Sequence, residues 1–172
     1  MTNYFDFYGL PVKFNLNEKE LKAKYFTLLK SNHPDFFVND PEKYKESLLN
    51  SSLNNEAYKC LSHFMSRANH ILSLSGLALE DKLPSDFLME MMDINEALDD
   101  LQHEPDSIRL QLLIDDISGI NNALDIELKE LAEISDSYNS LAEMPLKKVK
   151  ENLLKHKYIL RLRETLANIA PL

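Results

Sequence analysis

Apolar residues recur every three to four positions along most of this chain, which is the spacing of amphipathic α-helices. Over residues 17–31, a step of about 100° per residue brings Leu21, Tyr25 and Leu28 within roughly 60° of one another. Asn17 is a suitable N-cap for this run, and a glutamate three residues later completes a capping box. The pattern therefore predicts a helix over these residues with one core face.

A second helix is predicted after Asp40, which serves as an N-cap with Pro41 at the first helical position. Its apolar pattern runs through Tyr44, Leu48, Ala57 and Leu61. The tripeptide His33-Pro34-Asp35 stands between the two helices. Pro34 clashes with a preceding helical turn and restricts His33 to extended geometry, so the first helix must end before it. We therefore expect two helices that flank a short loop.

The remainder of the chain predicts three more helices. They begin near Ser85, near Ile108 and after Pro145, and the last two run to about Leu141 and Ile169. The sequence has only three glycines and no alternating β-type runs, which argues against a sheet. We therefore expect an all-α protein whose second half is an antiparallel three-helix bundle.

The first helix of this bundle has two apolar faces. One face gathers Phe87, Met91, Ile94, Leu98 and Leu101 within roughly 80°, which is enough for a core. The other holds Leu88, Met89 and Met92, with Glu96 on the same arc and Asp93, Asp99 and Asp100 nearby. Two interpretations stay open. A methionine-rich patch rimmed by acids suits a protein partner, whereas a helix that contacts two neighbours in a bundle needs a broad core face.

Charge divides the chain into two parts. Residues 1–75 hold 9 basic and 8 acidic side chains, whereas residues 76–172 hold 10 and 20. The acidic second part argues against nucleic acid or an anionic membrane as a partner. Gly76 can end a helix, so we expect a first domain over residues 1–75, a linker over 76–84 and a bundle over 85–172.

Three lysines of the first predicted helix form a stripe that ends beside the tripeptide. Lys19, Lys22 and Lys30 fall within about 80° of arc. Such a stripe suits an acidic partner, although lysines also solvate exposed helical faces without any partner. Asp35 adds a carboxylate that can accept a bidentate bond from an arginine, and Pro34 lowers the ordering cost of binding. This end of the molecule is therefore a candidate for recognition.

Catalysis and metal binding have little support in the sequence. No motif places a Ser or Cys nucleophile beside His33, so we expect no enzyme activity. Cys60 and His63 have a conceivable zinc spacing but lack two further ligands, so we expect no metal or other cofactor, and Cys60 is predicted to be a small core residue. His70, His103 and His156 stand singly and are predicted at the surface or at helix edges.

The sequence predicts neither a membrane-spanning segment nor a secretory signal peptide. The opening residues lack a basic start and an apolar run, and no stretch approaches about 18 uninterrupted apolar residues. A single cysteine suits a reducing compartment. We therefore expect a cytoplasmic protein.

The first third of the chain resembles the J-domain of heat-shock co-chaperones, which carries an exposed His-Pro-Asp between a basic helix and its antiparallel partner. Residues 4–11 (YFDFYGLP) are similar to the short opening helix and turn of that domain, and residues 54–61 (NNEAYKCL) to its Asn-x-Ala-Tyr-x-x-Leu segment. Phe36 and Asn32 depart from the family, which often has a basic residue after the Asp and an aromatic before the His. The resemblance implies that this loop, with Lys19, Lys22 and Lys30, contacts the ATPase domain of a heat-shock chaperone of the HscA or DnaK type and promotes ATP hydrolysis there.

The whole chain resembles the HscB family of iron–sulfur co-chaperones in length, in domain order and in the segments 87–90 (FLME) and 96–99 (EALD). The resemblance implies an L-shaped molecule whose second domain binds the cluster scaffold IscU. The scaffold-binding residues carried over are Leu88, Met89, Met92, Asp93, Glu96 and Tyr158. Tyr158 has a second interpretation, in which it packs between Leu154 and Leu162 with its hydroxyl at the surface. Arg67 lies in a segment like the interdomain part of the family, and we expect it either to fix domain orientation through an ion pair or to be exposed.

The resemblance also narrows the choice of function. It implies delivery of the scaffold to a specialised chaperone ATPase and assistance in the maturation of iron–sulfur proteins. Some relatives begin with a cysteine-rich zinc module, and a chain that begins at the J-domain matches the bacterial form. The alternatives are a J-domain co-chaperone for a different client, with a generic client-binding or dimerisation bundle, and a purely structural helical protein.

Overall fold

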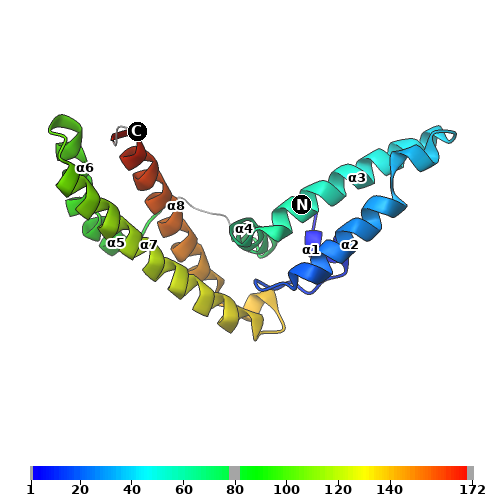
Figure 1. The fold of residues 1–172 in the computed structure, drawn as a ribbon. Coiled ribbons are helices and arrows are strands. Elements are labelled where there is room, and N and C mark those ends of the chain that lie inside the picture. Colours follow the sequence, from blue (N-terminus) through cyan, green and yellow to red (C-terminus); the bar gives the residue numbers. More distant parts are fainter. Residues whose placement is uncertain (1, 78–81, 170–172) are drawn as a thin grey trace. The chain divides into compact units, whose positions relative to one another are not determined.

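The computed structural model describes residues 2–77 and 82–169, and within that part the chain is helical without strands (Figure 1). The earlier elements are α1 (Tyr4–Tyr8), α2 (Glu18–Ser31), a 3₁₀ turn η1 (Pro34–Phe37), α3 (Pro41–Ser62) and α4 (Phe64–Leu74). The later elements are α5 (Ser85–Glu90), α6 (Met92–His103), α7 (Ser107–Asp136), a 3₁₀ turn η2 (Leu141–Glu143) and α8 (Leu146–Ile169). The predicted all-α fold class is confirmed.

The chain folds as two compact units. The first comprises Met1–Leu77 together with Ser135–Met144, and the second comprises Ala78–Ile134 and Pro145–Leu172. The first unit therefore draws on two separate stretches of sequence. Asp136 fastens the second stretch, because its carboxylate accepts hydrogen bonds from the backbone N–H groups of Phe14 (2.6 Å) and Asn15 (2.8 Å).

In the first unit, α2 and α3 lie side by side and are joined by the turn η1 (Figure 1). The predicted caps are confirmed: Asn17 accepts from the N–H groups of Lys19 and Glu20, and Asp40 accepts from that of Lys43. One buried side chain, Asn54, ties three helices together. It accepts a hydrogen bond from the Tyr8 hydroxyl (2.7 Å) and donates to the Tyr25 carbonyl (3.1 Å). Asn54 is the first residue of the segment that resembles the J-domain, and these hydrogen bonds give a structural reason for an asparagine there.

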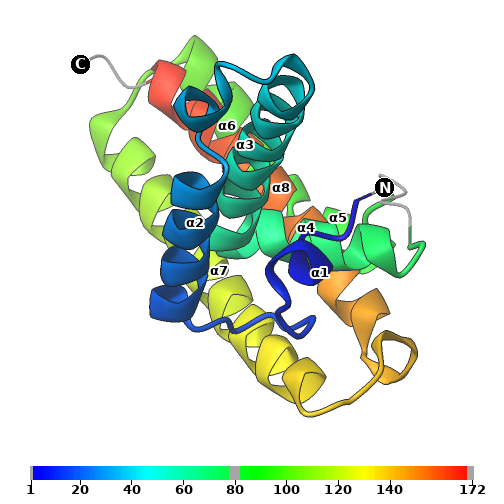
Figure 2. The same cartoon turned by 90° about the vertical axis from the view of Figure 1, so that its right-hand side faces the viewer.

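The apolar pattern of α3 is only half buried. Ala57 and Leu61 are fully buried, whereas Tyr44 and Leu48 are 39% and 46% exposed, so only the second half of the predicted pattern lies in the core. The reason is that α1 and α4 cover the half of the helix pair that lies away from η1, and no other described element of the first unit covers the half near it. Figure 2 views the first unit from the side of this uncovered end.

The second unit has the predicted core. Phe87, Met91, Ile94, Leu98 and Leu101 are all less than 10% exposed and pack with residues of α7 and α8. The first helix of the bundle, however, is interrupted: α5 ends at Glu90 and α6 begins at Met92, with Met91 between them at φ −83° and ψ −3°. Neither Gly nor Pro marks this position, so the sequence carried no signal for the break.

The middle helix α7 begins at Ser107 and ends at Asp136, five residues before the predicted end. The chain turns there because Asp136 is engaged by the backbone of residues 14 and 15, and Ser140 then caps η2 by accepting from the Ala142 N–H. The third helix matches its prediction to within one residue.

Two of the three histidines predicted at the surface are buried. His70 is 3% exposed, accepts a hydrogen bond from the Tyr4 N–H (3.2 Å) and stacks on the Tyr4 ring. His156 is 8% exposed, with its Nε2 3.6 Å from an oxygen of Asp125. His103 is exposed, as predicted. A histidine can be buried where a neighbouring polar group compensates it, and single-sequence reasoning cannot see those neighbours.

Arg67 is buried and not exposed. Its Nε donates to the Phe14 carbonyl (2.7 Å) and its Nη1 to the Leu61 carbonyl, so these contacts lie within the first unit. Burial lowers the pKa of the guanidinium, and the negative charges of Glu18 and Asp136 oppose that effect. Arg67 therefore stabilises the backbone at Phe14 and Leu61 by donating hydrogen bonds to their carbonyl groups. The expected ion pair is not what holds this side chain.

Candidate functional site

The His33-Pro34-Asp35 loop is held in a defined turn. His33 is extended, at φ −69° and ψ 126°, as the proline after it predicts. The chain then enters η1 at Pro34, and the His33 Nδ1 accepts a hydrogen bond from the Asp35 N–H (3.3 Å). A histidine thus caps a single 3₁₀ turn, and the bond holds the His33 ring at the start of that turn.

Both polar groups of the loop face solvent. The Asp35 side chain is 83% exposed and that of His33 is 48% exposed, with 3.6 Å between the His33 Nδ1 and the Asp35 carboxylate. Phe36 follows in the same turn, is 72% exposed and meets the His33 ring edge to face at 5.9 Å between centroids. The loop therefore presents a carboxylate, an imidazole and a phenyl ring together.

The predicted lysine stripe lies on an exposed face of α2. Lys19, Lys22 and Lys30 are all exposed, and none of them makes an ion pair within residues 2–77 and 82–169. Lys24, in contrast, reaches Glu20 at 3.9 Å on another side of the helix. The positive charge beside the loop is thus available to a partner.

The exposed second apolar face of the bundle decides between the two interpretations of that helix. Leu88, Met89 and Met92 are 43%, 70% and 64% exposed, so the interpretation in which they belong to the core is wrong. Asp93 and Glu96 are exposed as well. We call these five residues the apolar–acidic patch. It is carried by α5 and the start of α6, over the buried side chains of Phe87 and Met91.

Tyr158 of α8 lies beside the helices that carry this patch. Its ring meets that of Phe87 edge to face at 5.7 Å, and its hydroxyl accepts a hydrogen bond from the Asn95 side chain (2.7 Å). Tyr158 is only half buried, so part of the ring stays accessible. Sequence reasoning missed Asn95; the signal for it was an amide four residues after the buried Met91, at the edge of the core face.

Among residues 2–77 and 82–169, no three His, Cys, Asp or Glu side chains are grouped so as to hold a metal ion. Cys60 is half buried and not in the core as predicted, and burial raises the pKa of its thiol. In the same part of the chain, no helix combines the length and apolar character needed to cross a membrane.

The second unit is similar in sequence to a known protein family. A family model described as the HSCB C-terminal oligomerisation domain matches residues 83–167. Two curated relatives named co-chaperone protein HscB, from Buchnera aphidicola subsp. Acyrthosiphon pisum strains Tuc7 and APS, are 36% identical to this chain over 105 residues. That match covers 58% of this chain and 60% of each relative, which is less than two thirds of their length.

Two solved structures share the fold. The chaperone HscB from Vibrio cholerae has a TM-score of 0.67 at 24% identity, covering 98% of this chain and 97% of that one. The crystal structure of human co-chaperone protein HscB has a TM-score of 0.71 at 24% identity, covering 97% of this chain and 81% of that one. The C-terminal domain model, the curated relatives and the solved structures agree: residues 83–167 match the C-terminal domain of the HscB family, and the chain as a whole shares the fold of HscB co-chaperones.

Proposed function

We propose that this protein is a two-ended adaptor that brings an iron–sulfur scaffold protein of the IscU type to a heat-shock chaperone of the HscA or DnaK type. Residues 1–75 act as the J-domain and stimulate ATP hydrolysis by the chaperone. Residues 85–172 hold the scaffold, and residues 76–84 link the two. The adaptor has no catalytic residues or cofactor of its own, and it assists the maturation of iron–sulfur proteins in the cytoplasm, where a free thiol such as that of Cys60 persists.

The observation that carries the proposal is the exposure of Leu88, Met89 and Met92 above a complete core. Exposed apolar side chains in a contiguous set mark protein interaction sites, and methionine adapts to the shape of a partner. Tyr158 adds a half-buried aromatic ring on the neighbouring helix, next to Phe87. The scaffold is proposed to bind at the apolar–acidic patch together with Tyr158.

At the other end, Asp35 is proposed to accept a bidentate bond from an arginine of the ATPase domain, while Lys19, Lys22 and Lys30 face acidic groups of the same domain. The exposed carboxylate on a stiff turn supports this role, because little ordering entropy is lost on binding. His33 holds the turn through its bond to the Asp35 N–H. Hydrolysis of ATP then traps the scaffold on the chaperone.

A second candidate function keeps the J-domain and changes the role of the bundle. The matching family model is described as an oligomerisation domain, which favours self-association through the same unit. In that case Leu88 and Met89 would contact a second copy of the chain in place of a client.

A pull-down from native cell extract tests the proposal. The intact chain is compared with a variant carrying Leu88→Ala and Met89→Ala, and the captured proteins are identified by mass spectrometry. The proposal expects a scaffold protein that is captured by the intact chain and lost from the variant. Capture of a different client, or a dimer that dissociates in the variant during analytical ultracentrifugation, would replace it with the second candidate.

A further inference from the structure

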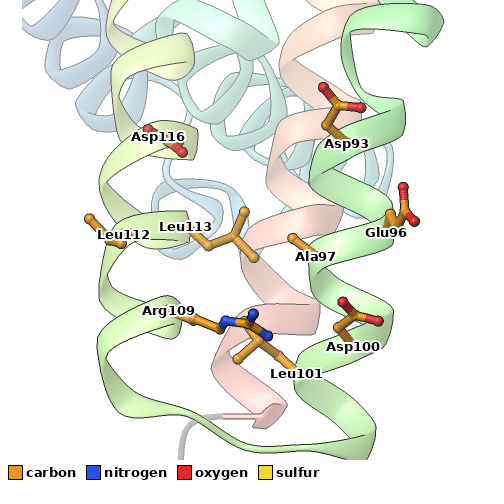
Figure 3. Close-up of a pocket in the computed structure, with 9 residues that line it drawn as sticks. All are labelled: Asp93, Glu96, Ala97, Asp100, Leu101, Arg109, Leu112, Leu113 and Asp116. Carbon is orange, nitrogen blue, oxygen red and sulfur yellow. The ribbon is translucent and has the colours of Figure 1, made fainter.

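The outer face of α7 carries an apolar stripe that points away from the core of the second unit. Ile108, Leu112 and Ile126 are 74%, 60% and 60% exposed. A step of about 100° per residue places these three side chains within roughly 40° of one another. Gly119 and Ala123, which are also exposed, lie on the same side of the helix. Figure 3 shows Leu112 on the side of α7 that faces away from α6. We call these five residues the α7 stripe.

Gly119 lies in the middle of the α7 stripe, and packing within one chain does not explain it. A Cβ atom placed there would meet no atom within 4 Å apart from the backbone of its own helix. The residue continues α7 on both sides and is not one of the glycines with positive φ, so no turn requires it. Glycine inside an exposed helix is less stable than alanine, but it lets a second backbone approach closely.

The two large side chains nearest to Gly119 on the stripe are placed symmetrically about it. Leu112 lies seven residues before Gly119 and Ile126 lies seven residues after it, which is about two helical turns in each direction. In a contact with two-fold symmetry, each residue of one copy meets the counterpart of its own partner in the other copy. Two antiparallel α7 helices with Gly119 on the two-fold axis therefore place Leu112 of each against Ile126 of the other. This match favours a second copy of the chain as the partner.

Polar residues beside the stripe favour the antiparallel orientation. Asp115 and Asn122 are both exposed on one edge of it. In the antiparallel pair, Asp115 of one copy lies beside Asn122 of the other, where the amide can donate to the carboxylate. The Gln111 side chain already donates to one oxygen of Asp115 (2.9 Å), which leaves the other oxygen for this bond. A parallel pair would instead place Asp115 against its own copy, and the like charges would repel each other.

We propose that two copies of this chain associate through the α7 stripe, antiparallel, with Gly119 of each copy on the two-fold axis. The matching family model is described as an oligomerisation domain, a description that names no surface, and the inference assigns one. The stripe shares no residue with the apolar–acidic patch, so the inference does not depend on the proposed function. One pair of helices makes a small interface, so the association is reversible, with a Kd on the order of 10 µM.

Analytical ultracentrifugation of the full chain, from about 1 to about 200 µM, tests the association. The stripe variant carries Leu112→Glu and Ile126→Glu. The control carries Leu49→Glu and Leu160→Glu, which add the same charge at leucines outside α7 that are 65% and 56% exposed. We expect the stripe variant to raise the dimer Kd at least about 30-fold and the control to change it less than about threefold. Circular dichroism checks that each variant remains folded.

Disulfide cross-linking tests the register and the orientation. Each chain first carries Cys60→Ser, because the native thiol is half buried and free to react. Gly119→Cys should then cross-link to its own copy, since residues on the two-fold axis of closely packed helices come within disulfide distance. Leu112→Cys mixed with Ile126→Cys should give a disulfide between the two different chains, whereas either chain alone should stay largely monomeric on a non-reducing gel. A size tag on one chain distinguishes the two kinds of product.

The outcomes separate this inference from the proposed function. An intact chain that stays monomeric up to about 200 µM would overturn the inference and leave the adaptor untouched. A dimer lost in the Leu88→Ala and Met89→Ala variant, but kept in the stripe variant, would move the contact to the apolar–acidic patch.

Two further results would also contradict the inference. Equal losses in the stripe variant and its control would reduce the effect to net charge. Cross-linking of Leu112→Cys to its own copy would show a parallel pair. A dimer that behaves as expected in a chain that binds no scaffold would uphold the inference while the adaptor falls.

Discussion

The loop at His33-Pro34-Asp35 and the patch on α5 and α6 are built for recognition in opposite ways. The loop is a short turn with an 83% exposed carboxylate beside a lysine stripe, and it covers no core. The patch is apolar, sits above the buried Phe87 and Met91, and is rimmed by acids. One surface therefore depends on a few directional charges, and the other depends on buried apolar area.

This difference explains why the two surfaces tolerate change differently. A charge-assisted bond is lost when one atom is replaced, whereas an apolar contact weakens in proportion to the area removed. Salt should likewise weaken binding at the loop more than binding at the apolar part of the patch. Three predictions test the contrast, and one tests the stability of the unit that carries the loop; they follow in order of decreasing effect.

The largest effect is expected for Asp35→Asn. Stimulation of the chaperone ATPase should be abolished, because an amide cannot accept the charge-assisted bidentate bond proposed for the carboxylate. Binding of the scaffold should stay within about twofold of the intact chain. Single-turnover ATP hydrolysis and titration calorimetry measure the two quantities.

The matched control for this variant is Glu42→Gln, which removes an exposed acid from the first turn of α3. Its stimulation should match that of the intact chain. If stimulation persisted in Asp35→Asn, the J-domain assignment would be wrong. The loop could then no longer be compared with the patch as a recognition surface.

The second prediction concerns Leu88→Ala with Met89→Ala. Scaffold affinity should fall by roughly 10- to 100-fold, because each truncated side chain at the centre of an interface costs about 1 kcal/mol or more. ATPase stimulation by the isolated adaptor should stay unchanged. A control at Ile126→Ala, which is 60% exposed on α7, should leave scaffold affinity as it is.

Stability separates this patch from the core beneath it. The Leu88 and Met89 variant should unfold at nearly the same denaturant concentration as the intact chain, whereas Phe87→Ala should lose about 3 to 5 kcal/mol of unfolding free energy. A large loss in the exposed variant would show that Leu88 or Met89 supports the fold, which their exposure in the structure does not predict.

The third prediction concerns pH and the first unit. Burial lowers the pKa of His70, and its Nε2 must be unprotonated to accept the Tyr4 N–H. A histidine with a lowered pKa in the folded state contributes full stability above its unfolded pKa of about 6.5, and this stability is lost as the pH falls through the folded value. Loss of the hydrogen bond should cost about 1 kcal/mol.

Hydrogen exchange at Tyr4–Tyr8, compared at about pH 7.5 and about pH 5, measures this loss once intrinsic rates are corrected. His70→Asn keeps an acceptor that does not titrate, so its protection should change less with pH than that of the intact chain. The exposed His103 provides the control, and His103→Asn should behave like the intact chain. Equal pH dependence in all three proteins would contradict the role given to His70.

The smallest effect is expected for Phe36→Lys. This residue is 72% exposed, so stability should be unchanged, and a lysine there extends the positive stripe toward the tripeptide. Affinity for the chaperone ATPase domain should rise about two- to threefold at low salt and return to its original value at high salt. Val38→Lys, at the end of the same turn and 63% exposed, shows whether the effect depends on position.

The sequence predicted most of what depends on local periodicity. The caps at Asn17 and Asp40, the five-residue core face from Phe87 to Leu101 and the start of α8 are all set by short-range pattern. What it could not predict depends on neighbours that are distant in sequence. The burial of His70 requires the Tyr4 backbone, and the exposure of Tyr44 requires knowing where α1 and α4 stop covering α3.

The candidate sites follow the same rule. Periodicity identified Leu88, Met89 and Met92 as a second apolar face, but only their exposure decided against a core position. The contact between Tyr158 and Asn95 spans 63 residues of sequence, and a pocket between α6 and α7 is lined by carboxylates from both helices (Figure 3). Such surfaces become visible only when the helices are packed.

The carboxylate of Asp136 has a consequence for how the molecule can be divided. Its two bonds hold the backbone of Phe14 and Asn15, although some 120 residues of sequence separate them. A gene fragment ending at residue 77 would encode every residue of the tripeptide loop, yet it would leave two N–H groups without their acceptor. The domain boundary predicted from the sequence therefore differs from the boundary of the folded unit, which includes residues 135–144. The N-terminal segment expressed alone should be less stable than the same segment within the full chain.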